Sequence, residues 1–147
     1  MSIFDKAVSQ TDASNPITSE YEGFLAILYA GISSDGKQKS SEINLALDIM
    51  IHKKMFNNAD THDWIGKMKT LKEQVGDEGK FINYAADKIT PGLRPMVFAN
   101  VVDMMLADGE VADMEKKTLE MMQKALKVDD NLALKIIEVV VIKNKGG

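Results

Sequence analysis

Apolar residues recur every three or four positions along almost the whole chain, and this helical spacing is the feature that most restricts its fold. Tyr21, Phe24, Leu25, Leu28 and Ile32 form the first such stripe, which is typical of one face of an amphipathic helix. Similar stripes follow up to about residue 142, separated by short segments with glycine, proline or aspartate. The spacing therefore predicts an all-α protein.

The stripes and the residues at their ends predict about seven helices. Ser19 and Glu22 fit a capping box at the start of the first helix. The second helix carries apolar residues on more than one face, which places it at the centre of the core. The expected ranges are about 21–32, 40–55, 64–75, 81–89, 93–107, 113–127 and 130–142.

The last of these segments is ambiguous, because residues 136–142 are rich in β-branched side chains and would also suit a buried strand. No partner strand is evident elsewhere in the sequence, so we expect a helix. Nothing resembles an interdomain linker. We therefore expect one helical domain over residues 17–142, preceded by an N-terminal segment, 1–16, with a short helix, and followed by a flexible tail, 143–147.

Composition excludes several classes of protein. The chain has no cysteine, which excludes thiol catalysis and a disulfide framework. Its net charge is −4 and Arg94 is its one arginine, whereas nucleic-acid-binding proteins normally present a basic, arginine-bearing face. No apolar run approaches the roughly 20 residues of a membrane helix, and the N-terminus lacks the features of a signal peptide. We expect a cytoplasmic protein that does not insert into the membrane.

The sequence contains two Asp-Gly turns with the same surroundings. Asp35-Gly36 is followed by Glu42, and Asp108-Gly109 is followed by Glu115, so that each glutamate lies seven residues after its aspartate. The two copies are 73 residues apart, since 35 and 42 become 108 and 115. Each turn also joins two amphipathic stripes. This spacing predicts a duplicated helix-loop-helix with a pseudo-two-fold core.

The four carboxylates of these turns have two interpretations. Each glutamate falls in the first turn of a helix, where free N–H groups and the helix dipole favour a negative charge, so capping explains the pattern. Alternatively, the copies pack together and their carboxylates hold a divalent cation, because hard cations prefer oxygen ligands. The candidate metal ligands are Asp35, Glu42, Asp108 and Glu115.

The second turn is the stronger candidate for a metal site. Its Asp-Gly-x-Val order and later glutamate match half of a calcium-binding loop, while the early ligand positions of such a loop are absent. Ca²⁺ or Mg²⁺ is favoured, with Zn²⁺ or Mn²⁺ as further options. Additional acidic residues lie close in sequence and provide a second shell or alternative ligands: Asp103, Glu110 and Asp113. In the first turn, Lys37 and Lys39 would neutralise the carboxylates in place of a cation, which favours the capping interpretation there.

The segment Ala107-Asp108-Gly109-Glu110-Val111 with Glu115, and its weaker upstream copy, resembles the TerB-like tellurite-resistance family. The resemblance covers about residues 17–142 and implies an all-α bundle of two pseudo-symmetric helical units. It also implies metal binding through the acidic motif residues and a role in tellurite and stress resistance with protein partners, including a TerC-type membrane protein. The chain would then lie at the inner face of the membrane, through this partner. No catalytic activity comes with the family.

Two alternatives differ from this interpretation. In the first, the chain is a structural or adaptor module whose carboxylates are caps and whose methionine-bearing helix contacts a partner. Met114 and Met121 lie on one face of that helix, and thioether side chains suit adaptable binding surfaces, although they also fill cores. In the second, Asp35, Asp108 and Glu115 hold a cation that activates water for hydrolysis. We expect no enzymatic activity, because no other general base accompanies them.

Overall fold

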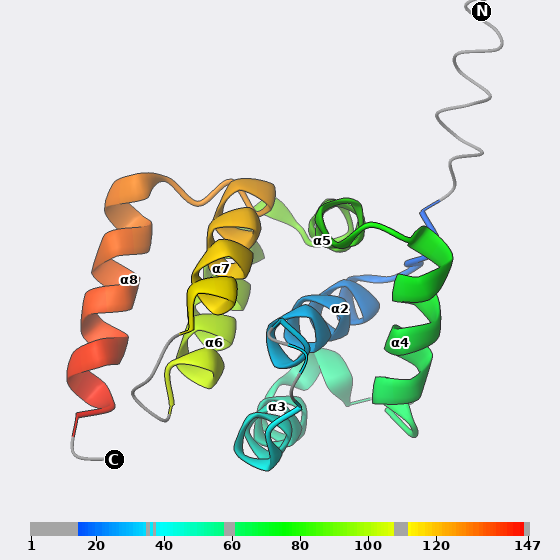
Figure 1. The fold of residues 1–147 in the computed structure, drawn as a ribbon, viewed down its shortest axis with the longest axis horizontal. Helices are drawn as coiled ribbons and strands as arrows, with labels where there is room; N and C mark the ends of the chain where they lie inside the picture. Colours follow the sequence, from blue (N-terminus) through cyan, green and yellow to red (C-terminus); the bar gives the residue numbers. More distant parts are fainter. Residues whose placement is uncertain (1–14, 35, 37, 58–60, 108–111, 146–147) are drawn as a thin grey trace, which may run out of the picture.

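The computed structural model describes residues 15–34, 36, 38–57, 61–107 and 112–145. Within them the chain forms seven α-helices and two short 3₁₀ turns, at residues 54–56 and 91–93, and no strand. The predicted all-α class and helix number are therefore confirmed. The helices, shown in Figure 1, are α2 (Glu20–Ile32), α3 (Ser40–His52), α4 (Trp64–Val75), α5 (Glu78–Asp87), α6 (Arg94–Met105), α7 (Asp113–Ala125) and α8 (Asp130–Lys143).

The ends of the helices follow from local chemistry. Ser19 Oγ accepts a hydrogen bond from Glu22 N at 3.3 Å, as a capping residue does. Glu22 does not complete the expected capping box with Ser19, because its carboxylate accepts from Thr18 N at 2.8 Å. Asp129 Oδ1 caps α8 by accepting from Leu132 N at 2.9 Å. The β-branched segment 136–142 lies within α8, so the expected helix is confirmed there.

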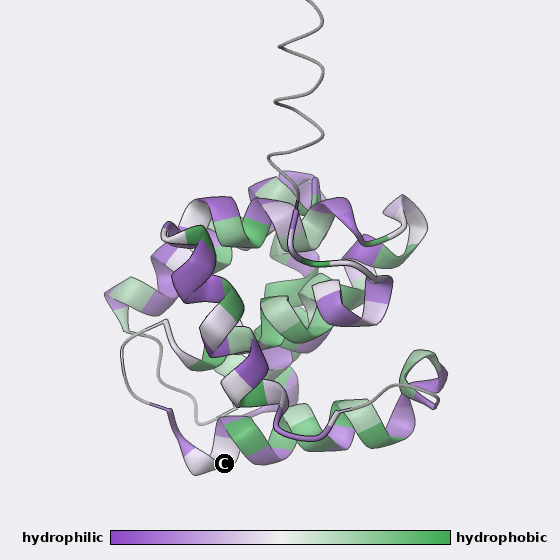
Figure 2. Cartoon of the chain, turned by 90° about the vertical axis from the view of Figure 1, so that its right-hand side faces the viewer, coloured by the Kyte–Doolittle hydropathy of each residue, from purple (hydrophilic) through white to green (hydrophobic). Residues whose placement is uncertain are grey.

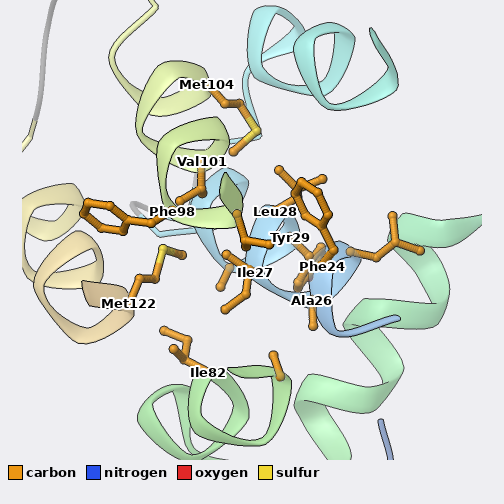
Figure 3. Packing of buried hydrophobic residues seen from close by; sticks show 14 of the residues in the cluster. Phe24, Ala26, Ile27, Leu28, Tyr29, Ile82, Phe98, Val101, Met104 and Met122 are labelled. Atoms are coloured by element: carbon orange, nitrogen blue, oxygen red, sulfur yellow. The ribbon is translucent and has the colours of Figure 1, made fainter. Parts of the chain in front are cut away.

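The core is built around α2, which lies in the middle of the molecule (Figure 1). Ten of its 13 residues are buried, and it packs against α3, α4, α5, α6 and α7. Figure 3 shows Phe24, Ile27 and Leu28 of α2 surrounded by Phe98 and Val101 of α6 and by neighbouring helices. In Figure 2 the hydrophobic segments gather toward this centre and hydrophilic ones toward the periphery.

The prediction that the second helix, now α3, lies at the centre of the core is wrong. Only Glu42, Ala46 and Met50 are buried on α3, while Leu47 and Ile51 are exposed, Ile51 to 72 %. The reason is that α3 lies at the edge of the bundle, where it packs mainly on α6 and α2. Trp64 on α4, by contrast, is 5 % exposed and anchors that helix in the core.

Candidate functional site

The two predicted turns connect equivalent helices of the bundle. One turn joins α2 to α3 and the other joins α6 to α7. Helix α3 spans residues 40–52 and helix α7 spans residues 113–125. Their first residues and their last residues are thus 73 positions apart, like the two copies of the motif. Each second helix also packs on the first helix of the other pair, α3 on α6 and α7 on α2. That these pairs arose by duplication stays a prediction.

The two pairs meet where α2 and α6 end. A Cβ atom on Gly31 would lie 2.9 Å from Met104 Cε and 3.0 Å from Val101 Cγ2, so the backbone of α2 packs directly against side chains of α6. Gly31 and Met104 occupy equivalent positions, 73 residues apart. The close approach occurs one residue before the last residue of each helix, at Ile32 and Met105. Both acidic turns therefore start from neighbouring points of the structure.

The described part of the first turn is held by short polar contacts. The side chain of Ser34 is buried and its Oγ donates to Gly31 O at 3.0 Å. Gly36 has a φ of 77°, in the left-handed region that glycine adopts without steric cost. Asp35 lies outside the described residues, as do Asp108 and Glu110 of the second turn. Their predicted roles as ligands are therefore untested.

Both predicted glutamates are buried. Glu42 is 4 % exposed and Glu115 is 2 % exposed, and each is the third residue of its helix, α3 or α7. Glu115 Oε1 accepts a hydrogen bond from Ala112 N at 3.1 Å. Because Ala112 has no side-chain acceptor to return this bond, the contact is one half of a capping box. The glutamate thus satisfies a free N–H group at the start of α7.

The other candidate ligands are engaged elsewhere or exposed. Asp103 accepts from Lys143 Nζ, at 3.0 Å to Oδ1 and 2.9 Å to Oδ2, and its Oδ1 accepts from Asn144 Nδ2 at 3.2 Å, so this carboxylate holds the end of α8. The Asp113 side chain is 99 % exposed, with Lys116 Nζ at 3.7 Å. Among the described residues, no three histidine, aspartate or glutamate side chains converge as a metal site would require.

The methionines of α6 and α7 divide between core and surface. Met104, Met105 and Met122 are buried, in agreement with a core-filling role. Met114 is exposed, whereas the half-buried Met121 faces α5, with its Sδ 3.8 Å from a Cβ atom built on Gly79. The predicted partner surface therefore offers one exposed methionine.

Two grooves were not predicted from the sequence. The larger, of about 450 Å³, lies between α2 and α4 and includes Trp64, Met68 and Leu71 in its lining. The other, of about 300 Å³, lies between α7 and α8 over α6. The sequence did contain a signal for the second groove, because α8 carries apolar residues on several faces. Over the described residues, no helix combines the length and apolarity needed to cross a bilayer.

The described residues form a helical bundle in which the segment after each Asp-Gly pair of the sequence leads to a helix with a buried glutamate in its first turn. A family model described as "Tellurite resistance protein TerB" matches residues 22–135. The chain therefore belongs to the TerB family, which confirms the resemblance inferred from the acidic motif. Neither the curated proteins nor the solved structures gave a significant match.

Proposed function

We propose that the chain is a non-enzymatic tellurite- and stress-resistance protein that binds a divalent cation at its acidic turns and acts through protein partners. The ligands are Glu42 and Glu115, with Asp35 and Asp108 of the two Asp-Gly turns. Ca²⁺ or Mg²⁺ suits this all-oxygen set best, and Zn²⁺ or Mn²⁺ is the alternative. The protein works in the cytoplasm, where a TerC-type partner brings it to the inner face of the membrane.

The observation that carries the metal proposal is the burial of both glutamates at equivalent positions. Glu42 and Glu115 are 4 % and 2 % exposed. Capping alone does not require burial, since a carboxylate at a helix start acts equally well at the surface. Burying an ionised carboxylate costs several kcal/mol unless a positive charge or hydrogen bonds offset it. A cation shared by the two turns would supply that charge, and the contact of α2 with α6 at Gly31, where both helices end, supports this arrangement.

The second candidate function is a structural or adaptor module in which the glutamates are caps. The bond from Ala112 N to Glu115 Oε1 favours it, because this bond is what a cap makes. In this alternative the partner contact lies on the exposed side of α7, at Met114. Hydrolysis at a bound cation is the remaining alternative, and it predicts turnover that chelator abolishes.

Replacing a glutamate by glutamine distinguishes a metal ligand from a helix cap. Glu115→Gln keeps an oxygen that accepts from Ala112 N and removes the charge that a cation needs, whereas Glu115→Ala removes both. We would follow thermal unfolding of chelator-stripped protein through Trp64 fluorescence, with each of the four cations added in turn. A cation that binds only the folded state at 100 times its dissociation constant stabilises by about 2.7 kcal/mol. For a domain of this size each kcal/mol shifts Tm by about 2–4 °C.

We expect one cation to raise the Tm of the wild-type protein and not that of the Glu42→Gln/Glu115→Gln variant. Without metal, the amide variant should be at least as stable as the wild type, because it buries less charge. Glu120→Gln is the matched control, since Glu120 lies on the same helix and is exposed. If no cation stabilises the wild type and only Glu115→Ala lowers the Tm, the glutamates are caps and the metal proposal is wrong.

A further inference from the structure

The outer face of α8 carries the largest group of exposed apolar side chains in the described part of the chain. Five of the nine large hydrophobic residues exposed there belong to this one helix. Contiguous exposed apolar surface on a protein is typical of sites of interaction. The residues are Leu132, Leu134, Val139, Val141 and Ile142.

An apolar groove lies beside this face. Its lining includes Phe98 and Leu106 of α6, Leu119 of α7, and Ile137 and Val141 of α8. Because Val141 also belongs to the exposed face, the groove and the face form one continuous surface. Figure 1 shows α8 at the outer edge of the bundle. The polar residues of the lining are Lys116, Glu120 and Gln123.

We propose that this surface binds α8 of a second copy of the chain, with the two helices antiparallel in a symmetric dimer. The seven-residue spacing puts Leu134 and Val141 on one flank of α8, and Leu132 and Val139 on the other. In an antiparallel pair related by a two-fold axis, each flank meets the same flank of its partner, because the interface is isologous. Each apolar flank therefore lies along one edge of the interface, beside the same flank of the partner.

The charges on the same face favour a second copy as the partner. Lys135 and Glu138 are exposed between the two apolar flanks, three residues apart near the middle of α8. When two such helices lie antiparallel with their midpoints opposed, Lys135 of each copy faces Glu138 of the other. The dimer thus gains two ion pairs and avoids contacts between like charges, which gives the pairing its register.

The proposal is independent of the metal site, because α8 takes no part in either acidic turn. The proposed surface also extends beyond the family match, which ends at residue 135. Val139, Val141 and Ile142 lie beyond that point.

The first test is sedimentation equilibrium of the full chain from micromolar to millimolar concentration, with and without chelator. We expect a reversible dimer, and we expect Ile142→Glu and Leu134→Glu each to raise its dissociation constant by about tenfold or more, because each puts a charge in place of an apolar side chain in the interface. Ile51→Glu is the matched control, because Ile51 is an even more exposed isoleucine, at 72 %, on α3. It should leave the dissociation constant unchanged.

A charge exchange tests the antiparallel register. Lys135→Glu alone should weaken the dimer, because it puts two glutamates opposite each other. Lys135→Glu combined with Glu138→Lys should restore wild-type association, since the ion pairs re-form with reversed sign. Circular dichroism of each variant reports whether it is folded, and exposed positions on a helix tolerate these changes.

Three results would overturn the proposal. The first is a wild-type protein that stays monomeric over the whole concentration range. The second is a dimer that the Ile142→Glu and Leu134→Glu variants leave intact, because its interface would then lie elsewhere. The third is a charge exchange that fails to restore association, since the contact would then not be antiparallel.

Discussion

Helices α2 and α8 are both rich in apolar residues, yet α2 buries ten of its 13 residues and α8 buries two of its 14. The difference comes from their neighbours. Five other helices pack around α2, whereas α8 packs mainly on α6. An apolar helix is therefore central only when enough elements surround it. When they do not, its apolar residues stay available for another molecule.

This difference predicts that removing an apolar side chain lowers the free energy of unfolding much more in α2 than in α8. Phe24 of α2 is fully buried and its ring lies 5.5 Å from that of Phe56. Phe24→Ala should lower the free energy of unfolding by about 3–5 kcal/mol, because the bundle cannot close the cavity. Urea unfolding followed by circular dichroism measures this loss.

Phe24→Leu is the control for this prediction, since it keeps most of the volume and should cost less than about 1.5 kcal/mol. A loss below about 1 kcal/mol for Phe24→Ala would contradict the central position of α2, because surface substitutions usually stay in that range.

The class and the helices were predictable from the sequence, because apolar spacing reports helices directly. The expected range 64–75 agrees with α4, and the expected ranges for α7 and α8 begin at or close to their first residues. The spacing did not reveal which helix is central. Apolar residues on several faces suggested α3, but that helix exposes Ile51 and Leu47. Centrality depends on the tertiary neighbours of a helix, and these are not encoded in its own pattern.

The candidate site was predictable only in part. The spacing of the motif selected Glu42 and Glu115, and both are placed in the first turn of a helix as expected. Their burial was not predictable, because it results from the packing of each helix on the other pair. Asp103 was selected for its nearness in sequence, but its carboxylate contacts Lys143 at the far end of the chain. Sequence distance is a poor guide to such contacts.

A second prediction concerns the cap at the start of α8. Asp129 is exposed and caps Leu132 N at 2.9 Å, so Asp129→Ala should cost about 1 kcal/mol. Asn131→Ala, at an exposed position in the same turn, should be close to neutral. Thermal unfolding of the two variants side by side would check this. Equal stability of the Asp129 variant and the wild type would show that contacts with α6 and α7 hold α8 without this cap.

The smallest change in the free energy of unfolding is expected for substitutions on the outer face of α8. It gives the sharpest contrast with substitutions in α2. Ile142 is 66 % exposed, so Ile142→Ser in the monomer should change the free energy of unfolding by less than about 0.5 kcal/mol. The measurement belongs at a concentration where the chain is monomeric, because the proposed dimer adds a concentration-dependent term to stability. A loss above about 1 kcal/mol in the monomer would mean that another part of the same chain covers this face. The apolar surface of α8 would then stabilise the fold, as that of α2 does, and would not be open to a second copy.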